Sequence, residues 1–181
     1  GGHCWLGGLG YVRAAVEIAE QAQALGLERA RVVMAAGSGG TLAGVLAGLT
    51  LLGSPLRPLG IDVGKLFEGF AQSVARLAGE LCDRLGAPRR FRPEDVPLIE
   101  GTYAAPSYGV PSEAGRAALE RLVRTEGILL DPVYTAKAFA GLLDLMDRGA
   151  LGSDEPIIFL HTGGLPALFA FEVDPDSARS S

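Results

Sequence analysis

The sequence predicts an α/β fold in which helices cover both faces of a parallel sheet, giving three layers. Short apolar runs alternate with longer amphipathic ones along the whole chain, as in repeated strand–helix units. The short runs are almost continuously apolar, which is typical of strands buried on both faces. Glycine or a small polar residue follows several of them, where a buried strand must turn. The 181 residues suffice for one domain with a sizeable core.

Helices are predicted where apolar residues recur every three or four positions. Their expected ranges are 9–25, 41–52, 66–85, 113–126 and 136–148, with a short further helix ending at Phe171. We expect Ser112 to cap the fourth helix. Leu85 of the third helix and Met146 of the fifth are expected to face inward. The glycines that follow four of these ranges suit the left-handed conformation of a helix end: Gly26, Gly53, Gly86 and Gly127.

Strands are predicted at 31–36, 57–63, 128–134 and 156–161, the third ending in a turn. Residues 87–112 are rich in proline and charge and show neither helical nor strand periodicity. We therefore expect a long irregular connection there, and such connections in compact domains are often functional. Residues 1–172 are expected to form one unit, and 173–181 a polar tail.

Composition narrows the class of protein. The net charge is −5 and the sequence pI about 5.1, so no basic stripe is available to neutralise a nucleic acid. Cys4 and Cys82 have no metal-binding spacing, and His3 and His161 are the only histidines, so we expect no metal site. No apolar run is long enough to span a membrane, and no signal-peptide pattern opens the chain. We expect a cytoplasmic protein with no nucleic-acid or membrane partner.

The first candidate site is the stretch "GSGGT", which follows the apolar run "RVVMAA" and precedes a helix. Its glycines allow the backbone to approach a ligand closely, and the amides at the start of the helix favour an anion. The stretch is neither a P-loop nor a G-x-G-x-x-G fingerprint, so a small phosphate monoester fits better than a dinucleotide. Alternatively, the turn only packs a helix close to a strand. The residues of the candidate are Gly37, Ser38, Gly39, Gly40 and Thr41.

Two other turns are expected to meet "GSGGT" at the same edge of the sheet, because parallel topology aligns the strand ends. They are "DPVYT", with Tyr134 and Thr135, and "HTGG", with Thr162. Structural roles alone would also explain these residues. Thr135 or Thr162 would then cap a helix, Tyr134 would be a core aromatic residue, and His161 a hydrogen-bonded buried imidazole.

Taken together, four stretches resemble the D-cysteine desulfhydrase and 1-aminocyclopropane-1-carboxylate (ACC) deaminase family. They are "AAGSGGTLAG", "APSYGVPS", "EGILLDPVYTAKA" and "IIFLHTGGLPALFAF". The family comprises pyridoxal phosphate (PLP) enzymes of the tryptophan-synthase-β fold, also called fold type II. The resemblance extends from the opening Gly-Gly to about Phe171, and it implies that the chain is part of the large, cofactor-binding domain.

The resemblance also implies a role for each candidate. The "GSGGT" turn would hold the PLP phosphate, and the Thr162 hydroxyl would face the pyridine nitrogen, where a neutral group disfavours a full pyridinium charge. Thr135 and Gly163 would be further cofactor contacts. Tyr108 and Tyr134 would flank the substrate, and either could shuttle a proton.

Two positions separate the activities within the family. ACC deaminases typically carry glutamate where this chain has Thr135, and they tend to have "HLGG" where it has "HTGG". Both differences favour the elimination that converts D-cysteine, a small amino acid, to pyruvate, sulfide and ammonia. The resemblance further implies that the intact enzyme is a homodimer. ACC deaminase stays open as an alternative, and so does a non-catalytic module that binds a phosphate ligand.

Enzymes of this family hold PLP as a Schiff base with a lysine, and this chain contains only Lys65 and Lys137. Lys65 lies at a predicted helix entry. Lys137 matches a family lysine that is not the Schiff-base residue. We therefore expect a C-terminal fragment without the lysine-bearing portion and the small domain. Such a fragment should be inactive alone and bind PLP weakly.

Overall fold

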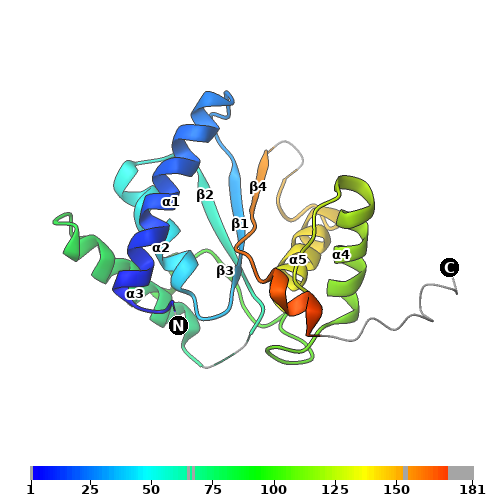
Figure 1. Cartoon of the computed structure of the whole chain (residues 1–181). Helices are drawn as coiled ribbons and strands as arrows, with labels where there is room; N and C mark the ends of the chain where they lie inside the picture. The colour runs from blue at the N-terminus through cyan, green and yellow to red at the C-terminus, as the bar shows by residue number, and fades with distance from the viewer. Residues whose placement is uncertain (1, 65, 67, 153–154, 171–181) are drawn as a thin grey trace, which may run out of the picture.

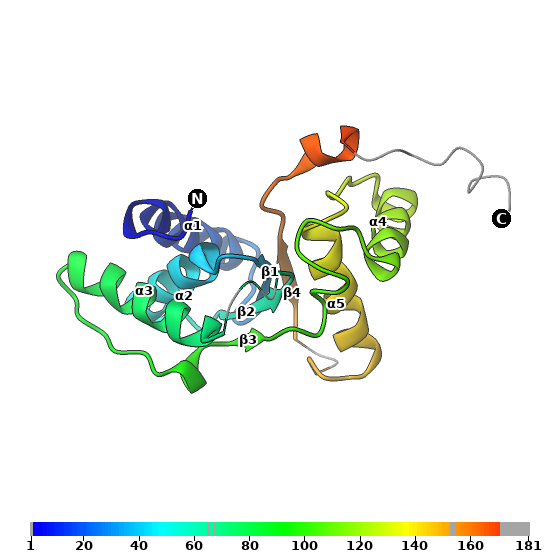
Figure 2. The same cartoon turned by 90° about the horizontal axis from the view of Figure 1, so that it is seen from below.

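The computed structural model describes residues 2–64, 66, 68–152 and 155–170 (Figure 1). Its strands pair in parallel in the order β3-β2-β1-β4. The elements are α1 (Trp5–Ala24), β1 (Arg31–Ala36), α2 (Gly40–Leu52), β2 (Arg57–Asp62), α3 (Phe70–Arg84), η1 (Pro93–Asp95), β3 (Leu98–Ile99), α4 (Glu113–Glu126), α5 (Thr135–Asp147), β4 (Ile157–Leu160) and η2 (Leu165–Phe169). The helices α1, α2 and α3 lie on one side of the sheet and α4 and α5 on the other (Figures 1 and 2). The predicted three-layer α/β fold is therefore confirmed.

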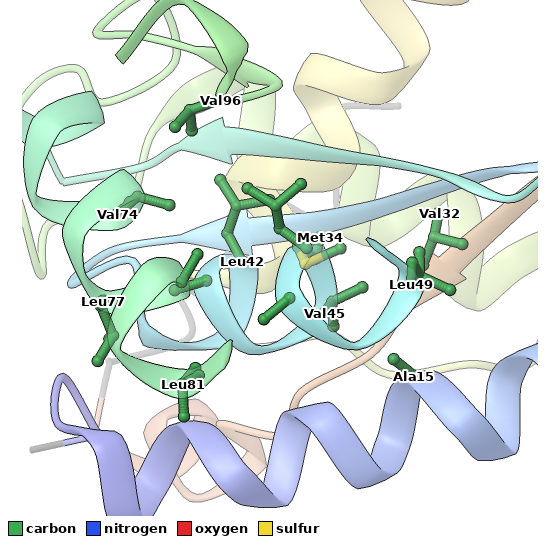
Figure 3. Close-up of a cluster of buried hydrophobic side chains, with 14 of the residues drawn as sticks. Ala15, Val32, Met34, Leu42, Val45, Leu49, Val74, Leu77, Leu81 and Val96 are labelled. Atoms are coloured by element: carbon green, nitrogen blue, oxygen red, sulfur yellow. The ribbon is translucent and has the colours of Figure 1, made fainter. Parts of the chain in front are cut away.

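Strand β1 is buried on both faces, and its side chains alternate between two cores. Val32 and Met34 point toward α1, α2 and α3 (Figure 3), whereas Val33 and Ala35 pack against α5. This alternation explains why the strand is apolar at consecutive positions, since each face needs its own apolar set. Helix α2 lies in the middle of the first core and is apolar almost all round. No helix in the described ranges is long and apolar enough to cross a membrane.

Two helices begin four residues away from the expected position. Helix α1 begins at Trp5 rather than residue 9, because Gly8 packs directly on Leu81 of α3, and this contact holds a glycine-rich turn in the helix. A Cβ on Gly8 would lie only 2.8 Å from a Leu81 methyl group. Helix α3 begins at Phe70 rather than residue 66, because Gly69 has a φ of +73° and precedes the first helical turn.

Two side chains predicted to face inward are about half exposed: Leu85 at 47% and Met146 at 50%. Leu85 follows the last residue of α3, so the helix no longer holds it against the core. Met146 lies at the margin of the buried stripe formed by Ala138, Leu142 and Leu145. Periodicity gives the direction of a helix face but not the extent of the neighbour that covers it.

The prediction of a strand within 128–134 is wrong, whereas the turn predicted at its end is present. These residues form an extended connection and a turn from α4 to α5, which pack against each other on the same side of the sheet. A connection between two neighbouring helices need not enter the sheet, and Ile128 and Leu129 are accordingly about half exposed. The fourth strand is instead β3, which pairs with Gly60 and Ile61 of β2. It has only two residues, too few for any periodic pattern within the irregular segment 87–112.

An ion cluster joins the strands at the amino end of the sheet. The Glu155 carboxylate accepts hydrogen bonds from Arg31 at 2.9 Å and from Arg57 at 2.6 Å, so it joins the first residues of β1 and β2. Its side chain is only 7% exposed. Burial alone would raise the pKa of Glu155, but the hydrogen bonds and charges of Arg57 and Arg31 outweigh it, and the pKa is lowered.

We predict that Glu155→Gln lowers the free energy of unfolding by about 2 kcal/mol at neutral pH, because two arginines lose a partly buried partner. A carboxylate with a lowered pKa stabilises the fold above its unfolded pKa, and this stabilisation is lost as pH falls through the folded value. The difference between wild type and variant should therefore disappear in acid. Denaturant titrations across pH measure it. Glu17→Gln, in the exposed pair with Arg13, is the control and should change stability by under about 1 kcal/mol. Equal effects of the two substitutions would contradict the prediction.

Candidate functional site

Three segments meet at the carboxyl edge of the sheet: the turn after β1, the turn after β4 and the start of α5. Together with α1 and the residues before it, they border a cavity of about 220 Å³, whose lining residues are Gly2, Tyr11, Ser38, Gly40, Thr41, Tyr134 and Thr162. A neighbouring cavity of about 350 Å³ is lined by Tyr108, Gly109, Asp131, Val133, Tyr134, Thr162, Gly163, Gly164 and Ala167. Because Tyr134 and Thr162 line both, the two cavities form one candidate site. Apart from Gly37, Gly39 and Thr135, every predicted site residue lines it.

The glycine turn after β1 leaves the amino end of α2 uncapped. Gly39 occupies the N-cap position with a φ of +85°, and no side chain caps the helix. The first turn of α2 contains no acidic residue. Its free amide groups and the positive end of the helix dipole therefore favour an anion in the cavity beside Ser38 and Thr41. The turn also packs tightly, since a Cβ on Gly37 would lie 2.6 Å from the Tyr134 ring. Close packing and an open helix end thus occur together, so the two interpretations of the stretch are compatible.

Tyr134 is fixed against that turn. Its hydroxyl oxygen accepts a hydrogen bond from the Gly37 amide at 3.0 Å. Burial raises the pKa of Tyr134, and the Gly37 hydrogen bond offsets only part of this effect. The phenol is therefore protonated at neutral pH, and its own O–H remains a potential donor toward the site.

The Thr162 hydroxyl is buried and has no hydrogen-bond partner within the part of the chain that the structure describes. A buried hydroxyl without a partner costs about 1–3 kcal/mol, and folded proteins contain few of them. Thr162 lines both cavities. The Thr162 hydroxyl is therefore available to hydrogen-bond a molecule bound in these cavities.

His161 and Thr135, by contrast, form internal hydrogen bonds. The Gly163 amide donates to His161 Nδ1 at 3.1 Å, so Nε2 carries the proton and donates to the Leu129 carbonyl at 2.8 Å. The Thr135 hydroxyl donates to Asp131 Oδ1 at 2.6 Å and accepts from the Asp131 amide at 3.0 Å. The direct cofactor contact predicted for Thr135 stays a prediction, and the structure gives its hydroxyl an internal partner.

Asp131 and Tyr11 are site residues that the sequence did not single out. Asp131 is 1% exposed and lies against Gly164, where a Cβ would approach the carboxyl group to 2.7 Å. It therefore joins the start of α5 to the turn after β4. The Asp-Pro pair before a helix was the available signal, because aspartate often binds backbone amides at such starts.

Tyr11 reaches the cavity because α1 crosses α2 at glycines. A Cβ on Gly44 would lie 2.5 Å from the Tyr11 Cβ, and one on Gly48 would lie 2.6 Å from the Ala15 Cβ. The four-residue spacing of glycines along α2 could have predicted this close approach. Sequence alone does not say which α1 side chain it brings to the cavity.

A larger cavity, of about 560 Å³, lies at the opposite edge of the sheet. It is formed by the end of α1 and the segments that precede β1 and β2, and none of the predicted site residues lines it. Its lining includes Glu20 and Glu28, which would repel an anion. Size alone therefore does not identify the functional site.

A family model of pyridoxal-phosphate dependent enzymes matches residues 4–163, and the chain belongs to this family. A D-cysteine desulfhydrase of Yersinia enterocolitica is 46% identical over 171 residues, which cover 94% of this chain and 51% of that protein. The chain thus spans about half the length of the curated relatives it matches. These findings confirm the family predicted from the four stretches, with PLP as its cofactor.

Solved structures support the same fold. An ACC deaminase homologue superposes with a TM-score of 0.78 at 42% identity, covering 90% of this chain and 47% of that one. A T.th. threonine deaminase has a TM-score of 0.52 at 23% identity, covering 94% and 60%, and it shares the fold.

The residues present fit PLP at its phosphate and its ring. The uncapped end of α2 suits a phosphate, and the unpartnered Thr162 hydroxyl suits a ring nitrogen. The covalent lysine of the family is not offered here by the described residues. Lys137, the one lysine among them, is bound to two backbone carbonyls, and Lys65 lies outside them.

We predict that Thr162→Val leaves the cofactor-free protein as stable as wild type or stabilises it by about 1 kcal/mol, because an unpartnered buried hydroxyl is removed. Thr135→Val is the matched control. It removes a hydroxyl with two hydrogen bonds and should lower the free energy of unfolding by about 2 kcal/mol. Chemical denaturation without cofactor measures both variants. A loss for Thr162→Val as large as that for Thr135→Val would contradict the assignment of Thr162 as unpartnered.

Proposed function

We propose that this chain supplies the phosphate- and ring-binding part of a PLP-dependent lyase that converts D-cysteine and water to pyruvate, hydrogen sulfide and ammonia. The observation that carries the proposal is the unpartnered Thr162 hydroxyl in the cavity that the uncapped end of α2 also reaches. One group suits a neutral ring nitrogen and the other a phosphate, and PLP presents both.

One set of residues would bind the cofactor, and another would take part in proton transfer. The amides and hydroxyls of Ser38 and Thr41 would hold the phosphate, with the α2 dipole adding to the attraction. Thr162 would donate to the ring nitrogen or accept from it while remaining uncharged. When bound, the cofactor supplies a conjugated ring that accepts the electron pair left by removal of the α-proton.

The two tyrosines would flank the amino-acid substrate in this proposal, which is supported by their position on the cavity that Thr162 also lines. Tyr134 is held by Gly37 and remains protonated, so it could donate a proton to the departing sulfur. Tyr108 is 53% exposed at the mouth of the larger part of the site, where it could cover the substrate. The abstracting base would be the covalent lysine of the family, supplied from outside the described residues.

D-cysteine is favoured over ACC by the residues and by the relatives. Thr135 and Thr162 occupy positions where ACC deaminases typically carry glutamate and leucine. The Yersinia relative at 46% identity is named a D-cysteine desulfhydrase. The second candidate is ACC deamination, since the solved structure at 42% identity is titled an ACC deaminase homologue.

We predict that the double variant Ser38→Ala, Thr41→Val weakens PLP binding about tenfold or more, because each hydroxyl would donate to a charged phosphate. Affinity for pyridoxal, which lacks the phosphate, should not change. Equilibrium dialysis with both ligands measures this in the chain itself. Thr50→Val, an exposed substitution on the same helix, is the control. An equal loss of affinity for PLP and pyridoxal would mean that these hydroxyls do not bind the phosphate. If the wild-type chain bound no PLP at all, the proposed function would be contradicted.

For the enzyme that contains this chain, we predict faster release of sulfide from D-cysteine than of 2-oxobutyrate from ACC. Colorimetric sulfide and keto-acid assays under the same conditions compare the two. Preference for ACC would establish the second candidate.

A further inference from the structure

Lys137 is a buried lysine with an uncommon set of partners. It lies in the first turn of α5 and is 1% exposed. Its ammonium group donates to the carbonyl oxygen of Ala104 at 3.1 Å and to that of Ser107 at 2.8 Å. It forms no ion pair within the ranges that the structure describes. Burial lowers the pKa of this amine.

Packing alone does not account for a lysine there. Burying an amine is unfavourable unless hydrogen bonds compensate, and a methionine of similar length would fill the space without that penalty. The specific contribution of Lys137 is therefore its pair of hydrogen bonds, which reach across about 30 positions of sequence to a single loop.

The loop that Lys137 holds is attached upstream at two points. The Gly101 amide donates to Asp62 at 3.0 Å, and the Tyr103 hydroxyl donates to Asp144 of α5 at 2.5 Å. Residues 105–110, which follow these points, are exposed, and Lys137 binds the carbonyls on either side of residues 105 and 106. Tyr108 follows Ser107 directly. Its ring lies near Gly64, where a Cβ would approach it to 3.2 Å, and it lines the cavity shared with Tyr134 and Thr162. The two carbonyls bound by Lys137 thus lie shortly before the side chain that borders the site.

We propose that Lys137 is a positioning residue that holds Tyr108 over the substrate end of the site. One turn of α5 then places both tyrosines, Tyr134 as part of the helix entry and Tyr108 through the lysine. The inference rests on the proposed function for the identity of the site. Lys137 contacts the loop of Tyr108 and not the amino end of α2. Through Tyr108 it should affect binding of the amino-acid substrate, and it should leave phosphate binding unchanged.

The test compares Lys137→Met with Leu142→Met. Leu142 is buried on the same helix and packs in the core that contains Val33 and Ala35. In Lys137→Met, hydrogen exchange of amides in residues 104–110 should speed up about tenfold or more, while PLP affinity by dialysis stays within twofold. In the intact enzyme, KM for D-cysteine should rise about tenfold with a smaller change in kcat. Tyr108→Ala should raise KM for D-cysteine by a smaller factor in the Lys137→Met variant than in the wild type. Leu142→Met should change neither loop exchange nor KM.

Unchanged exchange in the loop, or an unchanged KM, would overturn the inference while leaving PLP binding and the proposed function intact. Loss of PLP affinity in Lys137→Met alone would also overturn it, because it would place the lysine at the phosphate end. If Lys137→Met does not fold, Lys137→Gln decides by the same readouts. Its amide nitrogen is one bond nearer the backbone than the lysine Nζ and is uncharged, so it cannot reproduce both hydrogen bonds. Loop exchange should therefore still increase over wild type, and wild-type exchange in that variant would refute the role.

Discussion

The hydrogen bond from the Gly37 amide to the Tyr134 hydroxyl joins the two helical layers at the edge of the sheet. Gly37 directly follows β1, the strand that separates the two cores, and Tyr134 immediately precedes α5 on the other side. The contact requires a bare backbone, since any side chain at Gly37 would collide with the tyrosine ring. The geometry of both cavities follows from it, because Tyr134 borders each of them.

Chemically similar residues in the site differ by the partners that surround them. Thr135 and Thr162 both border the turns at the sheet edge, but Asp131 engages one hydroxyl and nothing in the described structure engages the other. A satisfied hydroxyl stabilises the fold, whereas an unsatisfied one lowers its stability unless a ligand is bound. The hydroxyl of Thr135 is therefore used within the fold, whereas that of Thr162 is left available to a ligand.

Sequence reasoning found the local features of the fold and missed those that depend on distant contacts. The buried strand at 31–36, the apolar α2 and the Ser112 cap follow from composition and spacing, and the structure contains all three. The start of α1 depends on Gly8 packing against Leu81, and the two residues of β3 depend on pairing with β2. Neither contact is encoded in a local pattern. The same holds in the site, where the glycine turn was recognisable but Asp131, Tyr11 and the bonds of Lys137 were not.

The surroundings of α2 have a consequence for how an anion would be held at its amino end. The helix contains no charged residue and is enclosed along most of its length by α1, α3 and the sheet. The attraction of an anion is therefore supplied by backbone amide groups within the first turn, where salt weakens it. Because the helix carries no cationic side chain, side-chain substitutions along its buried length would leave that attraction in place.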